Sequence, residues 1–190
     1  MHELWSAFGW VIPILALVTI TSILAVSIWK KKKGKGRWMN LLPVLLLSIS
    51  IGGICLITLT PFLGGGGVNG GSNGQTNMEP FSNLKLNLLY RNHLEVPIRN
   101  LLANVFLFVP FAFFSSWWMR HQRAIVLKVT FLGALLSFFI ELTQYFLPLG
   151  RSTDIDDWLM NTLGSLIGGI LFIIGGFFYK VWRLNNRKNK

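Results

Sequence analysis

The chain has 190 residues, a formal net charge of +11 at pH 7, 52% hydrophobic residues and only 13% charged residues. About a quarter of the residues in a soluble domain are charged, and a disordered chain has low hydrophobicity, so this composition excludes both classes. A nucleic-acid-binding domain is basic but less apolar, so no nucleic-acid partner is expected. The single cysteine excludes an intrachain disulfide framework. The composition therefore predicts a small polytopic membrane protein.

Five apolar runs are each long enough to cross a bilayer as a helix, which takes about 20 residues. They cover approximately residues 5–29, 41–63, 98–119, 124–147 and 158–182. Aromatic residues, which favour membrane interfaces, mark several of their ends. Because no Lys or Arg precedes the first run, it is expected to be a true span and not a cleaved signal peptide. The predicted fold is an all-α transmembrane helix bundle of about five spans.

The basic residues predict the orientation of these spans. Most of the 18 Lys and Arg residues lie at 30–37, at 120–128 and after residue 179. An odd number of spans puts these three regions on one side, which the positive-inside rule makes cytoplasmic. The N-terminus is then outside and the C-terminus cytoplasmic. The acidic residues lie in the outer segments or, for Glu141, near the outer end of a span, which agrees with this topology.

The chain divides into three parts on this basis. Residues 1–37 hold the first span and a basic cytoplasmic loop, residues 38–182 form the main membrane domain, and residues 183–190 are a basic cytoplasmic tail. The membrane domain includes an outer loop at 64–99, which opens with a glycine-rich tether at 64–74. Residues 77–97 mix apolar and polar side chains, so they are expected to form a short interfacial helix or a flap over the outer surface.

Glu141 is the clearest candidate for a functional residue. A charged group at membrane depth is costly, so such a residue is a functional candidate by default. It lies one to two turns below the outer end of the fourth run, and Gln144 shares its helix face at i+3. The alternative is that Glu141 has only a structural role, as a hydrogen-bonding group between helices. The cost of burying a carboxyl group favours the functional interpretation.

A polar segment leads into the fifth run. It contains one cation and three carboxylates: Arg151, Asp154, Asp156 and Asp157. The carboxylates could bind a divalent cation, which prefers oxygen ligands. They could instead pair with Arg151 and Arg99 around a polar headgroup. Thr153 and Asp156 also have the spacing of a helix capping box, which accounts for one or two of the acids. Asn161 extends the polar face inward at i+4 from Asp157.

The third run adds polar groups at its outer end. Arg99 and Asn100 begin it, and Asn104 lies one turn deeper on the face of Asn100. In the fifth run, Gly164 and Gly168 have the spacing that permits close helix contact. We expect this contact to bring the polar residues of the fifth run near Glu141. The polar residues of three spans would then converge at the outer surface.

The same residues resemble a known family. The sequence at 141–144, the segment 150–157 and the run 161–164 with Gly168 resemble the signature of the VanZ-like membrane protein family. Residues 100–111 resemble its other motif, and residues 79–81 its Pro-Phe element. The resemblance covers about residues 41–182, and the first run and the glycine tract are not diagnostic. Ala103 and Ala112 stand where the family usually has glycine, a departure that bears on close packing.

The resemblance implies a multi-pass protein of the bacterial plasma membrane with a role in the cell envelope. The family is named after a protein associated with low-level resistance to teicoplanin, a lipoglycopeptide that acts outside the cell on wall precursors. The function expected here is an outward-facing site that binds, or modifies access to, a lipid headgroup, wall precursor or lipoglycopeptide. Its expected residues are Arg99, Asn100, Asn104, Glu141, Gln144, Arg151, Asp154, Asp156, Asp157 and Asn161.

Two other functions remain open. Glu141 could act as an acid or base in an enzyme with a lipid-linked or cell-wall substrate, or as the coupling residue of a small proton-coupled transporter. No inverted repeat is visible, which argues against a transporter. The sequence shows no motif for a nucleophile or a complete set of metal ligands, so a binding function is favoured over an enzymatic one. No cofactor is expected, apart from the divalent cation considered at Asp154, Asp156 and Asp157.

Overall fold

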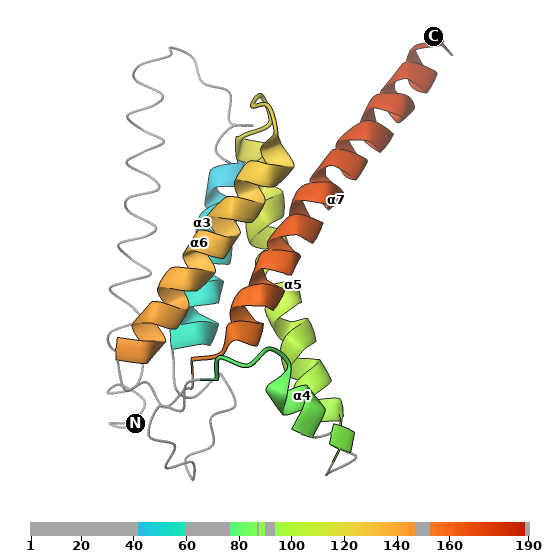
Figure 1. Cartoon of the computed structure of the whole chain (residues 1–190). Coiled ribbons are helices and arrows are strands. Elements are labelled where there is room, and N and C mark those ends of the chain that lie inside the picture. The colour runs from blue at the N-terminus through green and yellow to red at the C-terminus, as the bar shows by residue number, and fades with distance from the viewer. Residues whose placement is uncertain (1–41, 60–76, 87, 90–93, 147–152, 189–190) are drawn as a thin grey trace, which may run out of the picture.

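The computed structural model describes residues 42–59, 77–86, 88–89, 94–146 and 153–188. Four long helices and one short helix make up this part of the chain (Figure 1). They are α3 (Leu42–Leu59), α4 (Ser82–Leu86), α5 (Glu95–Trp118), α6 (Ile125–Phe146) and α7 (Ile155–Lys188). The four long helices are each long and apolar enough to cross a membrane. They confirm the all-helical prediction and the second to fifth predicted spans, and the first span at 5–29 lies outside the described residues.

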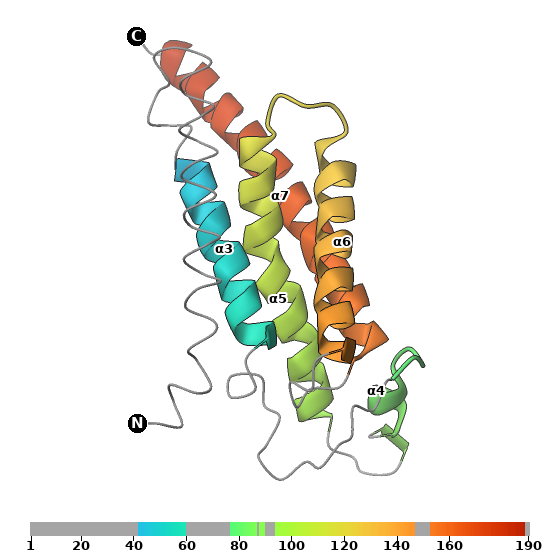
Figure 2. The same ribbon diagram turned by 90° about the vertical axis from the view of Figure 1, so that its left-hand side faces the viewer.

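The four long helices alternate in direction. In Figures 1 and 2 the end of α3, the start of α5, the end of α6 and the start of α7 gather at one end of the bundle, where α4 also lies. We call this the α4 end. The opposite end holds the turn between α5 and α6, and α7 extends beyond it. This alternation is the one that consecutive membrane spans require.

Helix α7 packs closely on α5 through two glycines. A Cβ added at Gly164 would lie 2.2 Å from the carbonyl oxygen of Val105, and one added at Gly168 would lie 2.3 Å from that of Val109. Only a residue without a side chain allows this approach. The buried methyl group of Ala112 lies beside Gly168, so an alanine at position 112 fits because glycine stands opposite it.

A second small face joins α7 to α6. A Cβ added at Gly133 of α6 would lie 1.9 Å from the Ser165 hydroxyl oxygen, and one at Gly169 would lie 2.9 Å from Val129. Helix α7 therefore lies against both α5 and α6. This result confirms that the small residues of the fifth run allow close helix contact.

The apolar core is small and lies between the long helices. Its buried residues are Ile54, Phe108, Phe111, Ala112, Ile125, Val129 and Ile140. The rings of Phe108 and Phe111 meet edge to face, with centroids 6.0 Å apart. Many other large apolar side chains face outward, such as Phe131, which is 65% exposed. Such a surface is suited to contact with lipid.

Candidate functional site

Glu141 connects the end of α6 to the start of α7. Its side chain is only 8% exposed. One carboxylate oxygen, Oε2, accepts a hydrogen bond from the backbone N–H of Asp154 at 3.0 Å. The hydroxyl of Thr153 donates to the backbone oxygen of Glu141 at 3.5 Å. The buried carboxyl group therefore contacts the segment that begins the next span.

Asp154 caps helix α7. Its side-chain Oδ1 accepts a hydrogen bond from the backbone N–H of Asp156 at 3.0 Å, and its backbone oxygen accepts from the N–H of Asp157 at 3.2 Å. These bonds satisfy donors that a helix start leaves without intrahelical partners. The capping box predicted from Thr153 and Asp156 is therefore wrong by one residue, because the hydroxyl of Thr153 donates toward Glu141 instead.

The other two carboxylates accept hydrogen bonds from different elements. Asp156 is 4% exposed, and its Oδ1 accepts from the backbone N–H of Phe81 at 2.7 Å. Asp157 accepts from the side-chain amide of Asn104 on α5. Among the described residues, no group of three or more His, Cys, Asp or Glu side chains could hold a metal ion. The considered divalent cation thus has no assembled ligand set in this part of the chain.

Asn77 attaches the 77–86 segment to the start of α7. Its backbone N–H donates to the oxygen of Thr153 at 2.9 Å, and its oxygen accepts from the N–H of Ile155 at 3.1 Å. Its side-chain amide also donates to Asp154 Oδ1 at 3.2 Å. Figure 1 shows the resulting arrangement, in which the 77–86 segment lies beside the N-terminal end of α7. The predicted short helix is present as α4, and the segment carrying it is held against the bundle.

Sequence reasoning did not select Asn77 or Phe81 as site residues. The side-chain oxygen of Asn77 accepts from the Ser82 hydroxyl at 2.8 Å, so this one residue organises the loop as well as its attachment. Phe81 has a positive φ of 59°, a conformation that costs a residue with a side chain about 1–2 kcal/mol. Its bond to Asp156 helps to hold it there. The Pro-Phe element noted in the sequence was the available signal.

Two buried amides form hydrogen bonds between neighbouring helices. Asn161 is 2% exposed, and its Nδ2 donates to the hydroxyl oxygen of Ser137 at 2.9 Å. Gln144 is 5% exposed, and its Nε2 donates to the backbone oxygen of Thr58 at 2.8 Å, which joins α6 to α3. The carbonyl oxygens of both amides, Asn161 Oδ1 and Gln144 Oε1, are buried and have no hydrogen-bond partner among the described residues.

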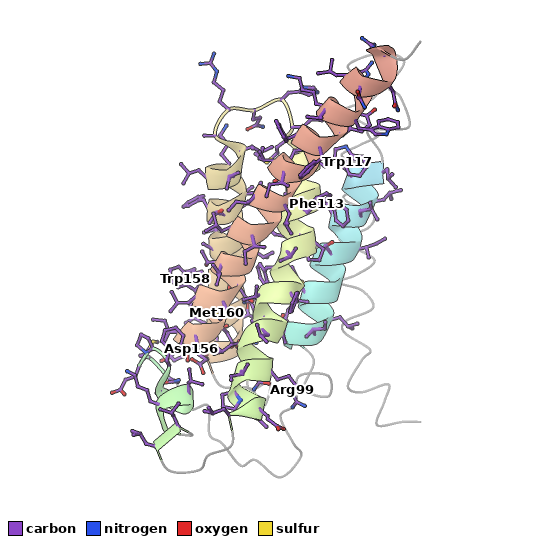
Figure 3. All side chains as sticks on the ribbon, turned by 90° about the vertical axis from the view of Figure 1, so that its right-hand side faces the viewer. Arg99, Phe113, Trp117, Asp156, Trp158 and Met160 are labelled. Atoms are coloured by element: carbon purple, nitrogen blue, oxygen red, sulfur yellow. The ribbon has the colours of Figure 1, made fainter. Side chains whose placement is uncertain are left out.

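The remaining expected residues lie elsewhere. Arg99 and Asn100 are exposed near the start of α5. Figure 3 shows Arg99 and Asp156 on different sides of the lower part of α5. Arg99 is therefore not brought to the carboxylates, because it lies on another face of its helix. Arg151 lies outside the described residues.

Three spans and the 77–86 segment supply the group that the structure brings together. We call this group the polar cluster, and it consists of Asn77, Asn104, Glu141, Gln144, Asp154, Asp156, Asp157 and Asn161. Four apolar helices able to span a membrane define a multi-pass helical membrane protein, and the polar cluster lies toward one end of it. The VanZ/LLP1 family model matches residues 10–178. The chain therefore belongs to the VanZ/LLP1 family, as the motifs predicted.

The family match also begins earlier than the motifs suggested, since it includes most of the first apolar run. It also includes the glycine-rich loop, which was not diagnostic by itself. Neither the curated proteins nor the solved structures gave a match to the chain.

Proposed function

We propose that the polar cluster is an outward-facing site that binds a lipid headgroup, a lipid-linked wall precursor or a lipoglycopeptide, and so modifies access to it. The protein would act in the bacterial plasma membrane, and a contribution to teicoplanin resistance belongs to the same proposal. The observation that carries it is the gathering of buried polar side chains from α6 and α7 and of the half-buried Asn104 from α5 toward one end of the bundle. Burying polar groups in such surroundings is costly unless they have partners.

The charge distribution supports the outward orientation. Arg120, Arg123 and Lys128 lie at or near the turn between α5 and α6, at the end opposite α4. Lys180 and Arg183 lie on the part of α7 that extends beyond the same end. The positive-inside rule assigns that end to the cytoplasm, so the polar cluster would face the outside.

The unsatisfied atoms indicate the chemistry of the ligand. The Nε2 of Gln144 donates to a backbone carbonyl, which can only accept, so this bond determines which end of the amide is the oxygen. The buried Oε1 is then an acceptor to which no described residue donates. A ligand that satisfies it must present a donor, such as a hydroxyl, an amide N–H or an ammonium group. Sugar–peptide wall precursors, amine-bearing headgroups and glycopeptides all have such groups.

A membrane enzyme that acts on a lipid-linked or cell-wall substrate is the second candidate. The buried carboxyl group of Glu141 favours it, because a carboxyl group shielded from water can serve as an acid or base. The two functions differ in whether the covalent structure of the target changes.

Cells with and without the protein would test the proposal. We expect cells with the protein to bind less fluorescent lipoglycopeptide, and Glu141→Ala or Asp157→Ala at equal membrane levels to abolish the difference. Asn100→Ala is the matched control, since Asn100 is exposed near the same end of the bundle. Mass spectrometry of lipid-linked precursors and wall peptides separates the candidates, because a new mass indicates the enzyme, whereas unchanged masses together with reduced lipoglycopeptide binding indicate the binder. Unchanged binding and unchanged masses in cells with the protein would contradict both.

A further inference from the structure

The C-terminal part of α7 stands apart from the bundle. Helix α7 has 34 residues, which at about 1.5 Å per residue is about 51 Å, well beyond the hydrocarbon core of about 30 Å. The rings of Phe113 and Phe172 meet edge to face at 5.7 Å. Three residues further on, a Cβ added at Gly175 or Gly176 would meet nothing within 4 Å. Every side chain described from residue 173 to residue 187 is exposed.

This projecting part has two chemically distinct faces. Lys180, Arg183 and Arg187 are spaced at i, i+3 and i+7, so they lie on one side of the helix. The other side carries Phe178, Val181 and Trp182, and Phe177 and Leu184 lie between the two sides. All five side chains are between 48% and 65% exposed. We call residues 177–187 the basic amphipathic segment. Neither a wholly aqueous nor a wholly apolar environment satisfies both of its faces.

The charge of the segment is of one sign. The sequence has no Asp or Glu after Asp157, so no acid on α7 beyond its first turn can neutralise the basic face. Tyr179 and Trp182 lie beside each other with ring centroids 6.1 Å apart, and Tyr and Trp favour the boundary between lipid tails and headgroups. A basic face, an apolar face and interfacial aromatic residues together match the properties of helices that lie at an anionic membrane surface.

We propose that the basic amphipathic segment binds anionic lipid headgroups at the end of the bundle opposite the polar cluster. Its apolar face contacts the acyl chains, and Lys180, Arg183 and Arg187 contact the lipid phosphates. The lipid thereby covers a part of α7 that no described helix covers. This inference does not depend on what the polar cluster binds, because the two sites lie at opposite ends of the bundle.

A dye on the segment tests the proposal in the full-length protein. Cys55→Ser removes the single native thiol, and Leu184→Cys then takes an environment-sensitive fluorophore. The protein is reconstituted into phosphatidylcholine vesicles containing equal fractions of brominated phosphatidylglycerol or brominated phosphatidylcholine, both of which quench the dye. Each basic residue at an anionic surface is worth about a five-fold preference. We therefore expect stronger quenching by the anionic lipid, and less of this excess at high salt.

Two sets of variants identify the residues responsible. Lys180→Gln, Arg183→Gln and Arg187→Gln together should remove the excess quenching, and exchanging Lys for Arg and Arg for Lys at the same positions should keep it. Arg120→Gln, Arg123→Gln and Lys128→Gln make the same charge change at the same end of the bundle and should leave the excess largely intact. An excess that survives the first triple replacement overturns the proposal. A dye that neither lipid quenches also overturns it, because a protein surface would then cover the segment.

Discussion

At the residue scale, Gly164 and Gly175 show that glycines of one helix can have different roles. The backbone of Gly164 is in close contact with the carbonyl group of Val105, whereas the space around Gly175 is open. Composition alone does not separate the two residues, because glycine is frequent throughout membrane helices. The close contact of Gly164 lies at the level where α5 and α7 contribute Asn104 and Asp157 to the polar cluster. Its lack of a side chain therefore helps to form the site.

The two glycines provide a matched pair of substitutions. Gly164→Ala should destabilise the protein by about 1–3 kcal/mol, because the added methyl group meets backbone that cannot move independently. Gly175→Ala should be neutral or stabilising by up to about 1 kcal/mol, because alanine has the higher helix propensity. Thermal unfolding of the purified protein in detergent, followed by helical circular dichroism, measures both. Equal melting temperatures for the two variants would contradict the close packing of α7 on α5.

At the element scale, the 77–86 segment and the start of α7 form one hydrogen-bonded unit. The backbone bridge between Asn77 and Asp154 and the bond from Phe81 to Asp156 join parts of the chain that are far apart in sequence. A short helix such as α4 is not stable alone in water. The order of the 77–86 segment therefore depends on these contacts with α7.

Replacement of Asn77 tests this dependence. Asn77→Ala removes the side-chain bond to Asp154 and the acceptor for Ser82, at a cost of about 0.5–1.5 kcal/mol for each hydrogen bond. Amide hydrogen exchange in the 77–86 segment should accelerate, while exchange in the middle of α6 should not change. Asn100→Ala, at an exposed asparagine, should leave exchange in the segment unchanged. If both variants exchange alike, the bonds of Asn77 do not order the segment.

At the scale of the whole molecule, charge and polar groups are separated along the bundle. The acidic residues of the described chain lie at the α4 end or, like Glu141, within one to two turns of it, and most of its basic residues lie at the other end. By the positive-inside rule, this separation favours an orientation in which the basic end faces the cytoplasm. It also leaves the two proposed binding regions in different leaflets.

The orientation can be measured by labelling intact cells. In a Cys55→Ser background, a cysteine introduced by Glu79→Cys should react with a membrane-impermeant maleimide. A cysteine introduced by Gln122→Cys should react only after the cells are opened. Both positions are exposed in the structure, so access depends on the side of the membrane. Labelling of position 122 in intact cells would reverse the proposed topology and place the polar cluster in the cytoplasm.

The sequence alone determined that four of the predicted segments are long apolar helices, and it determined the family to which the chain belongs. Apolar length, basic residues at span ends and ordered motifs are local properties, so they can be read without coordinates. The special status of Glu141 was also readable, because a carboxyl group within an apolar run is rare for a physical reason. The end of the fifth span was less predictable, since α7 continues to Lys188, into the segment predicted as a basic tail.

Only the tertiary structure decided which polar groups are partners. Asp154, not Thr153, caps α7, Asn77 attaches the 77–86 segment to α7, and Arg99 lies away from the carboxylates although it is close to Asn104 in sequence. The Asp154 cap is a bond within one helix start, whereas the last two outcomes depend on the rotation of one helix relative to another. That rotation follows from how side chains and glycines of α5, α6 and α7 fit together. Hydrogen bonds between groups distant in the chain form only after this packing, so no local pattern could specify them.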